Sequence, residues 1–188
     1  MQISWETLQQ QVRDCHRCDL CKTRTNPAFG EGNPDADILF VGEGPGHDED
    51  VLGRPFVGPA GQLLDRMLAA AGLERKNVYI ANVVKCRPPG NRNPQDDEAE
   101  TCLPYLRAQY VLIQPKIVVC LGAIATKYLY DRDAKISRVR GQWLCKGGVW
   151  FLPTYHPAAL LRDESKKRDA WMDFQALVAK YTELTENK

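Results

Sequence analysis

The 188-residue chain has 44% hydrophobic residues and carries 25 basic and 24 acidic side chains, so its formal net charge is +1. This balance excludes a protein that binds nucleic acid through overall positive charge, so any such contact must depend on a local cluster of basic residues. The length suits one domain over residues 1–188. Without a long apolar run or a signal peptide, we expect a cytoplasmic protein that does not span a membrane.

The first half of the chain predicts a helix, two strands and a second helix, separated by glycine-rich loops. Ser4 is the predicted N-cap of the first helix, and each short apolar run predicts a buried strand. The elements, in order, are a helix from Ser4 to near Cys15, a loop over 19–36, a strand over 38–41, a loop over 42–50, a helix over 59–71 and a strand over 78–81 that ends at Asn82.

The second half repeats the alternation of helix and strand. Acidic residues after Asn93-Pro94 predict a helix start, and Pro104 is expected to break or kink that helix. The elements are a basic loop over 86–94, a helix that begins at 94–98, a strand over 117–121, a helix over 123–130, a strand over 149–152 and a helix over 166–181.

This alternation predicts an α/β fold, a three-layer α/β/α sandwich around a central, mainly parallel four-stranded sheet. Sites in such sheets form beyond the carboxyl ends of the strands. Unusual residues follow three predicted strands there: Gly42–Asp50, Asn82–Arg92 and His156. We therefore expect one shared site at that edge.

Seven cysteines are many for this length, and their odd number in a reducing compartment disfavours a disulfide framework. They form an N-terminal group, a later pair and two isolated thiols: Cys15, Cys18 and Cys21; Cys86 and Cys102; Cys120 and Cys145. Thiolates suit zinc or an iron–sulfur cluster, and spacing alone does not separate the two. The isolated thiols are predicted to be ordinary buried cysteines.

Six motifs in a fixed order carry a family resemblance. They are Cys15-x-x-Cys18, the Gly-Glu-Gly-Pro-Gly loop over 42–46, Gly-Arg-Pro-Phe-Val-Gly over 53–58, Asn-Val-Val-Lys-Cys-Arg-Pro-Pro over 82–89 followed by Cys102, Arg-Val-Arg-Gly over 138–141, and His-Pro-Ala over 156–158. From about residue 15 to residue 162, the chain resembles the family 4 uracil-DNA glycosylases, which are iron–sulfur proteins.

The resemblance implies a [4Fe–4S] cluster that ties an N-terminal segment of about residues 1–26 to the rest of the domain. The implied ligands are Cys15, Cys18, Cys86 and Cys102. Cys21 leaves the N-terminal pair open, because Cys18-x-x-Cys21 has the same spacing. A zinc ion remains the alternative to the cluster.

The resemblance also implies hydrolysis of the N-glycosidic bond of uracil in DNA, with the base flipped out of the helix and an abasic site left behind. His156 would stabilise the departing uracil anion, Asn82 would read the base edge, and Phe56 would stack on the base. The implied substrate-binding residues are Gly42, Glu43, Gly44, Gly46, Phe56, Asn82 and His156.

The residue that positions the attacking water is not settled by the sequence. In the related classical uracil-DNA glycosylases an aspartate stands where this chain has Gly44. Glu43 and Glu49 are the candidate substitutes, and the resemblance favours Glu49 near the C5 edge of the base, where it would also exclude the methyl group of thymine.

Contacts with uracil-containing DNA, single- or double-stranded, are predicted for one basic loop and two further positions. Phosphate contacts are assigned to Lys85, Arg87 and Arg140. Leu160 is assigned as the wedge that fills the gap left by the flipped base, although a leucine on a short helix also suits the core. We expect a monomer, and a sliding clamp is a candidate partner.

Three alternatives stay open. The protein could be a non-catalytic module that binds uracil-containing or single-stranded DNA, a glycosylase for another deaminated base such as hypoxanthine, or a structural zinc protein with redox-active thiols. The residues at Asn82 and His156 argue for catalysis on uracil, whereas Gly44 in place of a carboxylate leaves the first alternative open.

Overall fold

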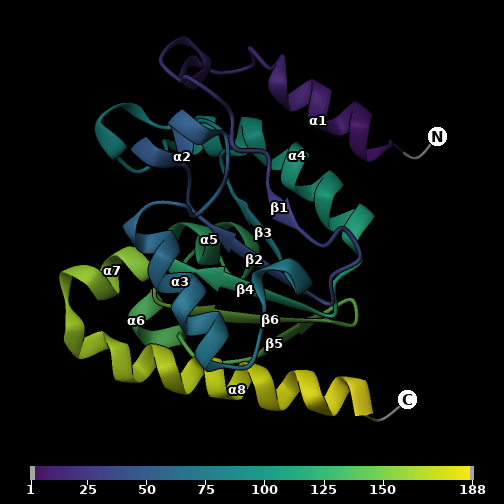
Figure 1. Cartoon of the computed structure of the whole chain (residues 1–188), viewed down its shortest axis with the longest axis vertical. Coiled ribbons are helices and arrows are strands. Elements are labelled where there is room, and N and C mark those ends of the chain that lie inside the picture. Colours follow the sequence, from purple (N-terminus) through teal and green to yellow (C-terminus); the bar gives the residue numbers. More distant parts are fainter. Residues whose placement is uncertain (1–2, 187–188) are drawn as a thin grey trace.

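The computed structural model describes residues 3–186, which form a six-stranded sheet between two layers of helices (Figure 1). The strand order is β1-β3-β2-β4-β6-β5. Four strands are parallel, namely β3 (Tyr79–Asn82), β2 (Ile38–Gly42), β4 (Ile117–Leu121) and β6 (Val149–Thr154). The edge strands β1 (Glu31–Gly32) and β5 (Leu144–Lys146) pair antiparallel to β3 and β6.

The predicted α/β sandwich with a mainly parallel sheet is confirmed, but the sheet has six strands and not the four predicted. The two missed strands are two and three residues long and lie at the edges. Neither has a continuous apolar run, because an edge strand needs none.

The strands are buried on both faces, which explains their uninterrupted apolar runs. Successive side chains of a strand point to opposite faces of the sheet. Leu39 and Val41 therefore belong to one buried cluster, and Ile38 and Phe40 belong to the other.

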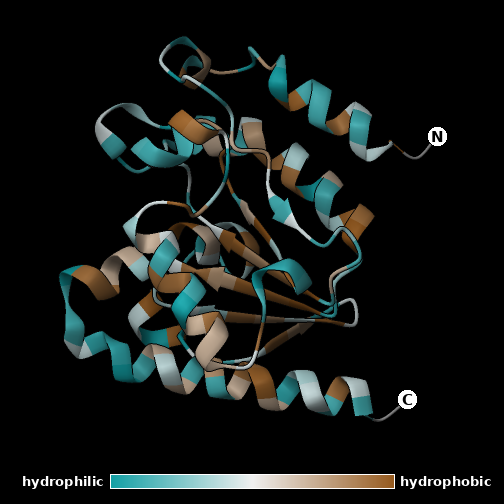
Figure 2. Ribbon diagram, in the orientation of Figure 1, coloured by the Kyte–Doolittle hydropathy of each residue, from teal (hydrophilic) through white to brown (hydrophobic). Residues whose placement is uncertain are grey.

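Five helices cover the two faces, with their polar sides outward (Figure 2). The cluster that includes Val41 receives apolar side chains from α1 (Trp5–Arg13), α4 (Asp96–Ile113) and α5 (Gly122–Leu129). The cluster that includes Phe40 receives them from α3 (Pro59–Ala70) and α8 (Lys167–Glu186).

Shorter helices lie in the connections. They are α2 (His47–Leu52), α6 (Ile136–Val139), α7 (Pro157–Arg162) and the 3₁₀ turns η1 (Asp19–Lys22), η2 (Arg75–Asn77), η3 (Pro89–Asn91) and η4 (Glu164–Lys166). Among residues 3–186, no helix combines the length and apolar character that crossing a membrane requires.

Several local predictions are confirmed. The Ser4 side chain accepts a hydrogen bond from the Thr7 N–H at 3.2 Å and caps α1. Helix α3 ends at Ala70, just before Gly72, which adopts a positive φ of 73°.

Four local predictions are wrong, at least in part. Cys120 is buried as expected, but Cys145 is exposed because it lies on the edge strand β5. The expected loop over 42–50 contains the start of α2, because the Glu49 carboxylate accepts a hydrogen bond from the Gly46 N–H and caps that helix. Of the expected break or kink at Pro104, the break does not occur, because α4 continues through Pro104 with Leu103 and Leu106 buried; the kink stays a prediction. Helix α8 runs to Glu186, five residues past the predicted end at residue 181.

Candidate active site

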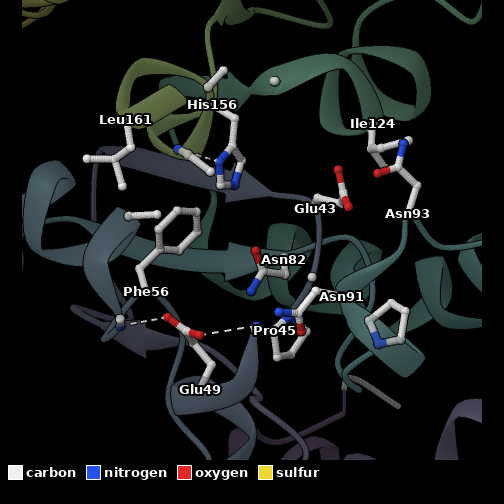
Figure 3. A pocket seen from close by; sticks show the side chains of 18 of the residues that line it. Glu43, Pro45, Glu49, Phe56, Asn82, Asn91, Asn93, Ile124, His156 and Leu161 are labelled. Carbon is white, nitrogen blue, oxygen red and sulfur yellow. Dashed lines mark hydrogen bonds between the residues drawn. The ribbon is translucent and has the colours of Figure 1, made fainter. Parts of the chain in front are cut away.

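A cavity of about 600 Å³, here called the base pocket, opens at the carboxyl ends of the four parallel strands (Figure 3). Glu43 follows β2, Asn82 ends β3, Gly122 follows β4 and His156 lies just beyond β6. The parallel register aligns these ends, with Gly42 opposite Asn82. The predicted shared site is thus present, and it includes a fourth strand end, at Gly122.

Asn82 lies at the centre of the base pocket and is 1% exposed. Its Oδ1 is the one buried side-chain oxygen or nitrogen of residues 3–186 that has no hydrogen-bond partner. A Cβ atom on Gly42 would lie 2.6 Å from this oxygen, so the glycine provides the space in which Asn82 fits. Because an unpaired buried amide oxygen is costly, this atom points to a ligand that supplies a donor.

Phe56 forms an aromatic wall of the pocket in a strained backbone conformation. Its φ is 51°, in the left-handed region that residues other than glycine rarely adopt. Its ring stacks with that of His156, with 5.4 Å between the centroids and 27° between the planes. The N–H groups of Val57 and Gly58 donate to Glu49 Oε1 at 2.9 and 2.8 Å, which holds the strained segment.

His156 presents a neutral imidazole to the pocket. Its Nδ1 accepts a hydrogen bond from the Ala158 N–H at 3.1 Å at the start of α7, which leaves the proton on Nε2. Burial, aided by the positive charge of Arg162, lowers the pKa of His156 to about 4. The side chain can therefore donate through Nε2 at neutral pH. Gly122 is needed beside it, because a Cβ atom there would lie 2.8 Å from His156 Cβ.

The two candidate carboxylates differ in how they are used. Glu49 accepts three main-chain hydrogen bonds, from Val57, Gly58 and, at 3.1 Å, Gly46. Glu43 lines the pocket and forms no hydrogen bond or ion pair within residues 3–186. Burial raises the pKa of Glu43, although Arg162 partly opposes this. Of the two glutamates, Glu43 therefore carries the free carboxylate; the exposed Asp48 at the pocket also forms no hydrogen bond or ion pair within residues 3–186.

The structure corrects the prediction that Lys85 contacts DNA. Lys85 is 1% exposed, and its Nζ donates to the Asn82 carbonyl oxygen at 3.0 Å and to Gln109 Oε1 at 2.7 Å. Burial lowers its pKa to about 8. Its ammonium group does not reach a surface at which a phosphate could bind.

Arg140 and Leu160 are also engaged in contacts within the protein, Arg140 in an ion pair and Leu160 in the core. Arg140 donates through Nε to the buried carboxylate of Asp173 at 3.0 Å, and Thr154 donates to the same carboxylate at 2.7 Å. Leu160 is 1% exposed and belongs to the core, which corrects its assignment as a wedge. The next residue, Leu161, is 45% exposed and lines the pocket (Figure 3).

Arg87 remains near the pocket. Its Nε donates to Asn91 Oδ1 at 2.7 Å, and its Nη1 lies 3.3 Å from His47 Nδ1. His47 and Asn91 both line the pocket, as do Arg92 and Arg162. Sequence reasoning missed Arg162, Leu161 and Gly122. Only Gly122 left a signal, as the glycine that directly follows an apolar strand.

A second pocket, here called the cysteine pocket, gathers five thiols from three segments: Cys15, Cys18, Cys21, Cys86 and Cys102. Arg24 also lines it, and its guanidinium donates to Cys86 Sγ at 2.9 Å. Burial raises the pKa of Cys86 to about 11, so the free thiol is protonated and a metal must displace the proton to bind.

The donor set of the cysteine pocket fits an iron–sulfur cluster or zinc, because both bind four thiolates. The Lys85 N–H donates to Cys102 Sγ at 3.3 Å, the kind of contact that stabilises a metal-bound thiolate. Within residues 3–186, no three Cys, His, Asp or Glu side chains converge as closely as ligands of a single ion. The cysteine pocket contains Cys21 as well as Cys18, so the choice of the N-terminal pair stays open.

Comparisons with known proteins show the family to which the chain belongs. Residues 29–175 match the family described as the uracil DNA glycosylase superfamily. The chain is 48% identical to a type-4 uracil-DNA glycosylase of Thermotoga maritima over 86% of this chain and 85% of the relative. It is 46% identical to one of Sulfurisphaera tokodaii over 93% and 83%, and 44% identical to one of Archaeoglobus fulgidus over 93% and 92%.

Proposed function

Because the chain belongs to the type-4 family of the uracil-DNA glycosylase superfamily, we propose that it removes uracil from DNA by hydrolysing the N-glycosidic bond and so starts base excision repair. The observation in this structure that best supports the assignment is the buried Oδ1 of Asn82, which has no hydrogen-bond partner within residues 3–186. It lies between Phe56 and the loop at Glu43. A flipped uracil supplies the donor that this atom lacks.

Recognition of the base follows from the two ends of the Asn82 amide. Uracil N3–H donates to Oδ1 and uracil O4 accepts from Nδ2, whereas cytosine has an acceptor at N3 and a donor at position 4. The Phe56 ring supplies the stacking surface, in a position that the Glu49 carboxylate fixes through the neighbouring main chain.

Catalysis rests on stabilising the two charges that develop when the C1′–N1 bond breaks. The bonding electrons move onto the uracil ring, and the Nε2–H of neutral His156 donates to O2 as negative charge collects there. The sugar becomes oxocarbenium-like. The free carboxylate of Glu43 accepts a hydrogen bond from a water and directs it to C1′.

Binding of the DNA uses the rim of the base pocket. The base is flipped out of a duplex or taken from a single strand, and Leu161 enters the space that a flipped base leaves. Two basic groups at or beside the rim, Arg87 and Arg162, contact the flanking phosphates, whereas Arg92 is already paired with Glu98.

The cysteine pocket holds a [4Fe–4S] cluster through Cys15, Cys18, Cys86 and Cys102, with Cys21 as the competing N-terminal ligand. This assignment is supported by the five thiols that line one pocket beside Arg24. The cluster serves structurally, because it joins the N-terminal segment to the chain after β3. Equal amounts of iron and acid-labile sulfide in the purified protein would support it, and stoichiometric zinc without iron would contradict it.

The function is tested with end-labelled oligonucleotides that carry a single uracil, thymine or hypoxanthine, treated with protein and then with alkali. We expect strand breaks at uracil alone, in single- and double-stranded substrates, and at least a hundredfold slower reaction for Asn82→Ala. Breaks at hypoxanthine would make the enzyme a glycosylase for another deaminated base. No break at any base, from protein with its metal bound, would refute catalysis and favour a binding module.

A further inference from the structure

Lys85 carries a buried positive charge that no carboxylate balances. Its two hydrogen-bond acceptors, the Asn82 carbonyl oxygen at 3.0 Å and Gln109 Oε1 at 2.7 Å, are both neutral. No ion pair to Lys85 occurs in the described part of the chain, 3–186. A buried ammonium without a negative partner is costly, so a nearby anion would stabilise it.

The cysteine pocket can supply that anion. Lys85 lies between two of the proposed ligands: it precedes Cys86, and its N–H donates to Cys102 Sγ at 3.3 Å. Lys85 itself lines the cysteine pocket together with Cys86 and Cys102. Because a cysteine binds a metal as a thiolate, a bound metal places negative charge at both positions.

Lys85 also contacts a residue of the base pocket, Asn82. Lys85 Nζ holds the main-chain carbonyl of Asn82, whose side chain reads the base in the proposed function. Gln109 is fixed in turn, because its Nε2 donates to the Phe29 carbonyl oxygen at 2.8 Å. The Lys85 ammonium group is therefore held between the cysteine pocket and the end of β3. The groups that hold it are the Asn82 carbonyl oxygen and the Gln109 side chain, both within the protein.

We propose that Lys85 is a positioning residue whose ammonium group is the counter-charge of the metal-bound thiolates and, at the same time, the anchor of the Asn82 main chain. Binding of the cluster and the geometry of the uracil-reading amide are thereby coupled. This inference rests on the proposed function and on the cluster assignment. It adds a role for a side chain that sequence reasoning assigned to DNA.

The test compares the Lys85→Met holoenzyme with wild type and with Lys167→Met. Lys167 is an exposed residue of α8, which lies on the far side of the sheet from α1 in Figure 1, and within residues 3–186 its only ion pair is with Glu164. Three quantities are measured: iron content, the midpoint potential of the cluster by voltammetry, and the single-turnover rate of uracil excision. Affinity for DNA that carries an abasic analogue is measured alongside.

Lys85→Met should keep its iron, because an apolar side chain is tolerated where a buried charge is removed. Its midpoint potential should shift to more negative values, since a nearby positive charge favours the reduced cluster. Uracil excision should slow about tenfold through the lost hydrogen bond from a charged donor to Asn82. Affinity for abasic DNA should stay close to wild type, and Lys167→Met should change none of these.

Two results would overturn the proposal. An unchanged potential would show that Lys85 is not the counter-charge, and an unchanged rate would show that it does not position Asn82. If Lys85→Met is insoluble, Lys85→Gln is tested in its place, because it removes the charge and keeps a hydrogen-bond donor. The shift of the midpoint potential to more negative values must then persist. If wild type itself does not excise uracil, the proposed function fails, while the potential still tests the counter-charge role.

Discussion

The two glutamates of the base pocket should respond differently to the same exchange of carboxylate for amide. Glu43→Gln removes a carboxylate that lines the pocket and that forms no hydrogen bond within residues 3–186. The excision rate should fall by about 10²- to 10³-fold, as expected when a group that orients or deprotonates the water is lost. Because burial already raises the pKa of Glu43, losing its charge should leave the free energy of unfolding unchanged or slightly higher.

Glu49→Gln should instead weaken the fold around the pocket. One of its oxygens accepts from Val57 and Gly58 and the other accepts from Gly46, so an amide nitrogen in either place faces an N–H donor. Loss of hydrogen bonds to a charged acceptor costs about 1–3 kcal/mol. At about 2–4 °C per kcal/mol for a chain of this size, the melting temperature should fall by about 2–12 °C. The rate falls as well, because Phe56 loses its fixed position.

Thermal melting and single-turnover excision at saturating enzyme separate the two roles, with Glu74→Gln as a surface control that loses only an exposed ion pair to Lys76. The reasoning is refuted if Glu49→Gln melts like wild type but is inactive while Glu43→Gln retains its activity. In that case Glu49 would be the residue that acts on the water.

Three further predictions concern pH, the wedge and the metal. The pKa of His156 is about 4 in the fold and 6.5 in the unfolded chain, so between these pH values only the unfolded chain binds the proton. The free energy of unfolding should therefore fall by at most about 3 kcal/mol as the pH drops from 6.5 to 4. Urea titrations should show a flatter pH dependence for His156→Gln, and an identical slope would contradict the shift. Leu161→Ala should slow excision from duplex more than from single-stranded DNA, whereas Leu160→Ala should lower stability by about 2–5 kcal/mol; the reverse pattern in melting and rate assays would restore Leu160 as the wedge. Cys86→Ala should lose iron and soluble protein together, and an iron-free variant with normal melting and activity would remove the cluster assignment.

The parallel core of the fold could be predicted because its strands are buried on both faces. Burial on both sides forces continuous apolar runs such as Ile38–Val41 and Ile117–Leu121, and these are visible in the sequence. The residues that follow such runs must share one edge of the sheet. The prediction of one site at Asn82 and His156 therefore needed only the strands and their common direction.

The predictions that failed depended on which side of an element a side chain occupies. Leu160 and Leu161 differ by one residue on α7, a rotation of about 100°, which places one in the core and the other at the pocket. Arg140 looks like any surface arginine until Asp173, 33 residues later on α8, is brought beside it. The basic loop around Lys85 likewise suggests a charged surface that could contact DNA. The sequence does not reveal that the ammonium group of Lys85 points into the protein.

The same contacts explain how an unpaired recognition atom is maintained in the base pocket. Phe56 and Asn82 are held through the main chain, by the hydrogen bonds of Val57 and Gly58 to Glu49 and by the hydrogen bond from Lys85 to the Asn82 carbonyl oxygen. His156 is held through its side-chain Nδ1, which accepts from the Ala158 N–H. The atoms that would meet the base, Asn82 Oδ1 and His156 Nε2, take no part in this support. Keeping these polar groups unpaired before substrate binds lowers the stability of the fold. Because the groups are already in place, they need little reorganisation when charge develops on the departing base.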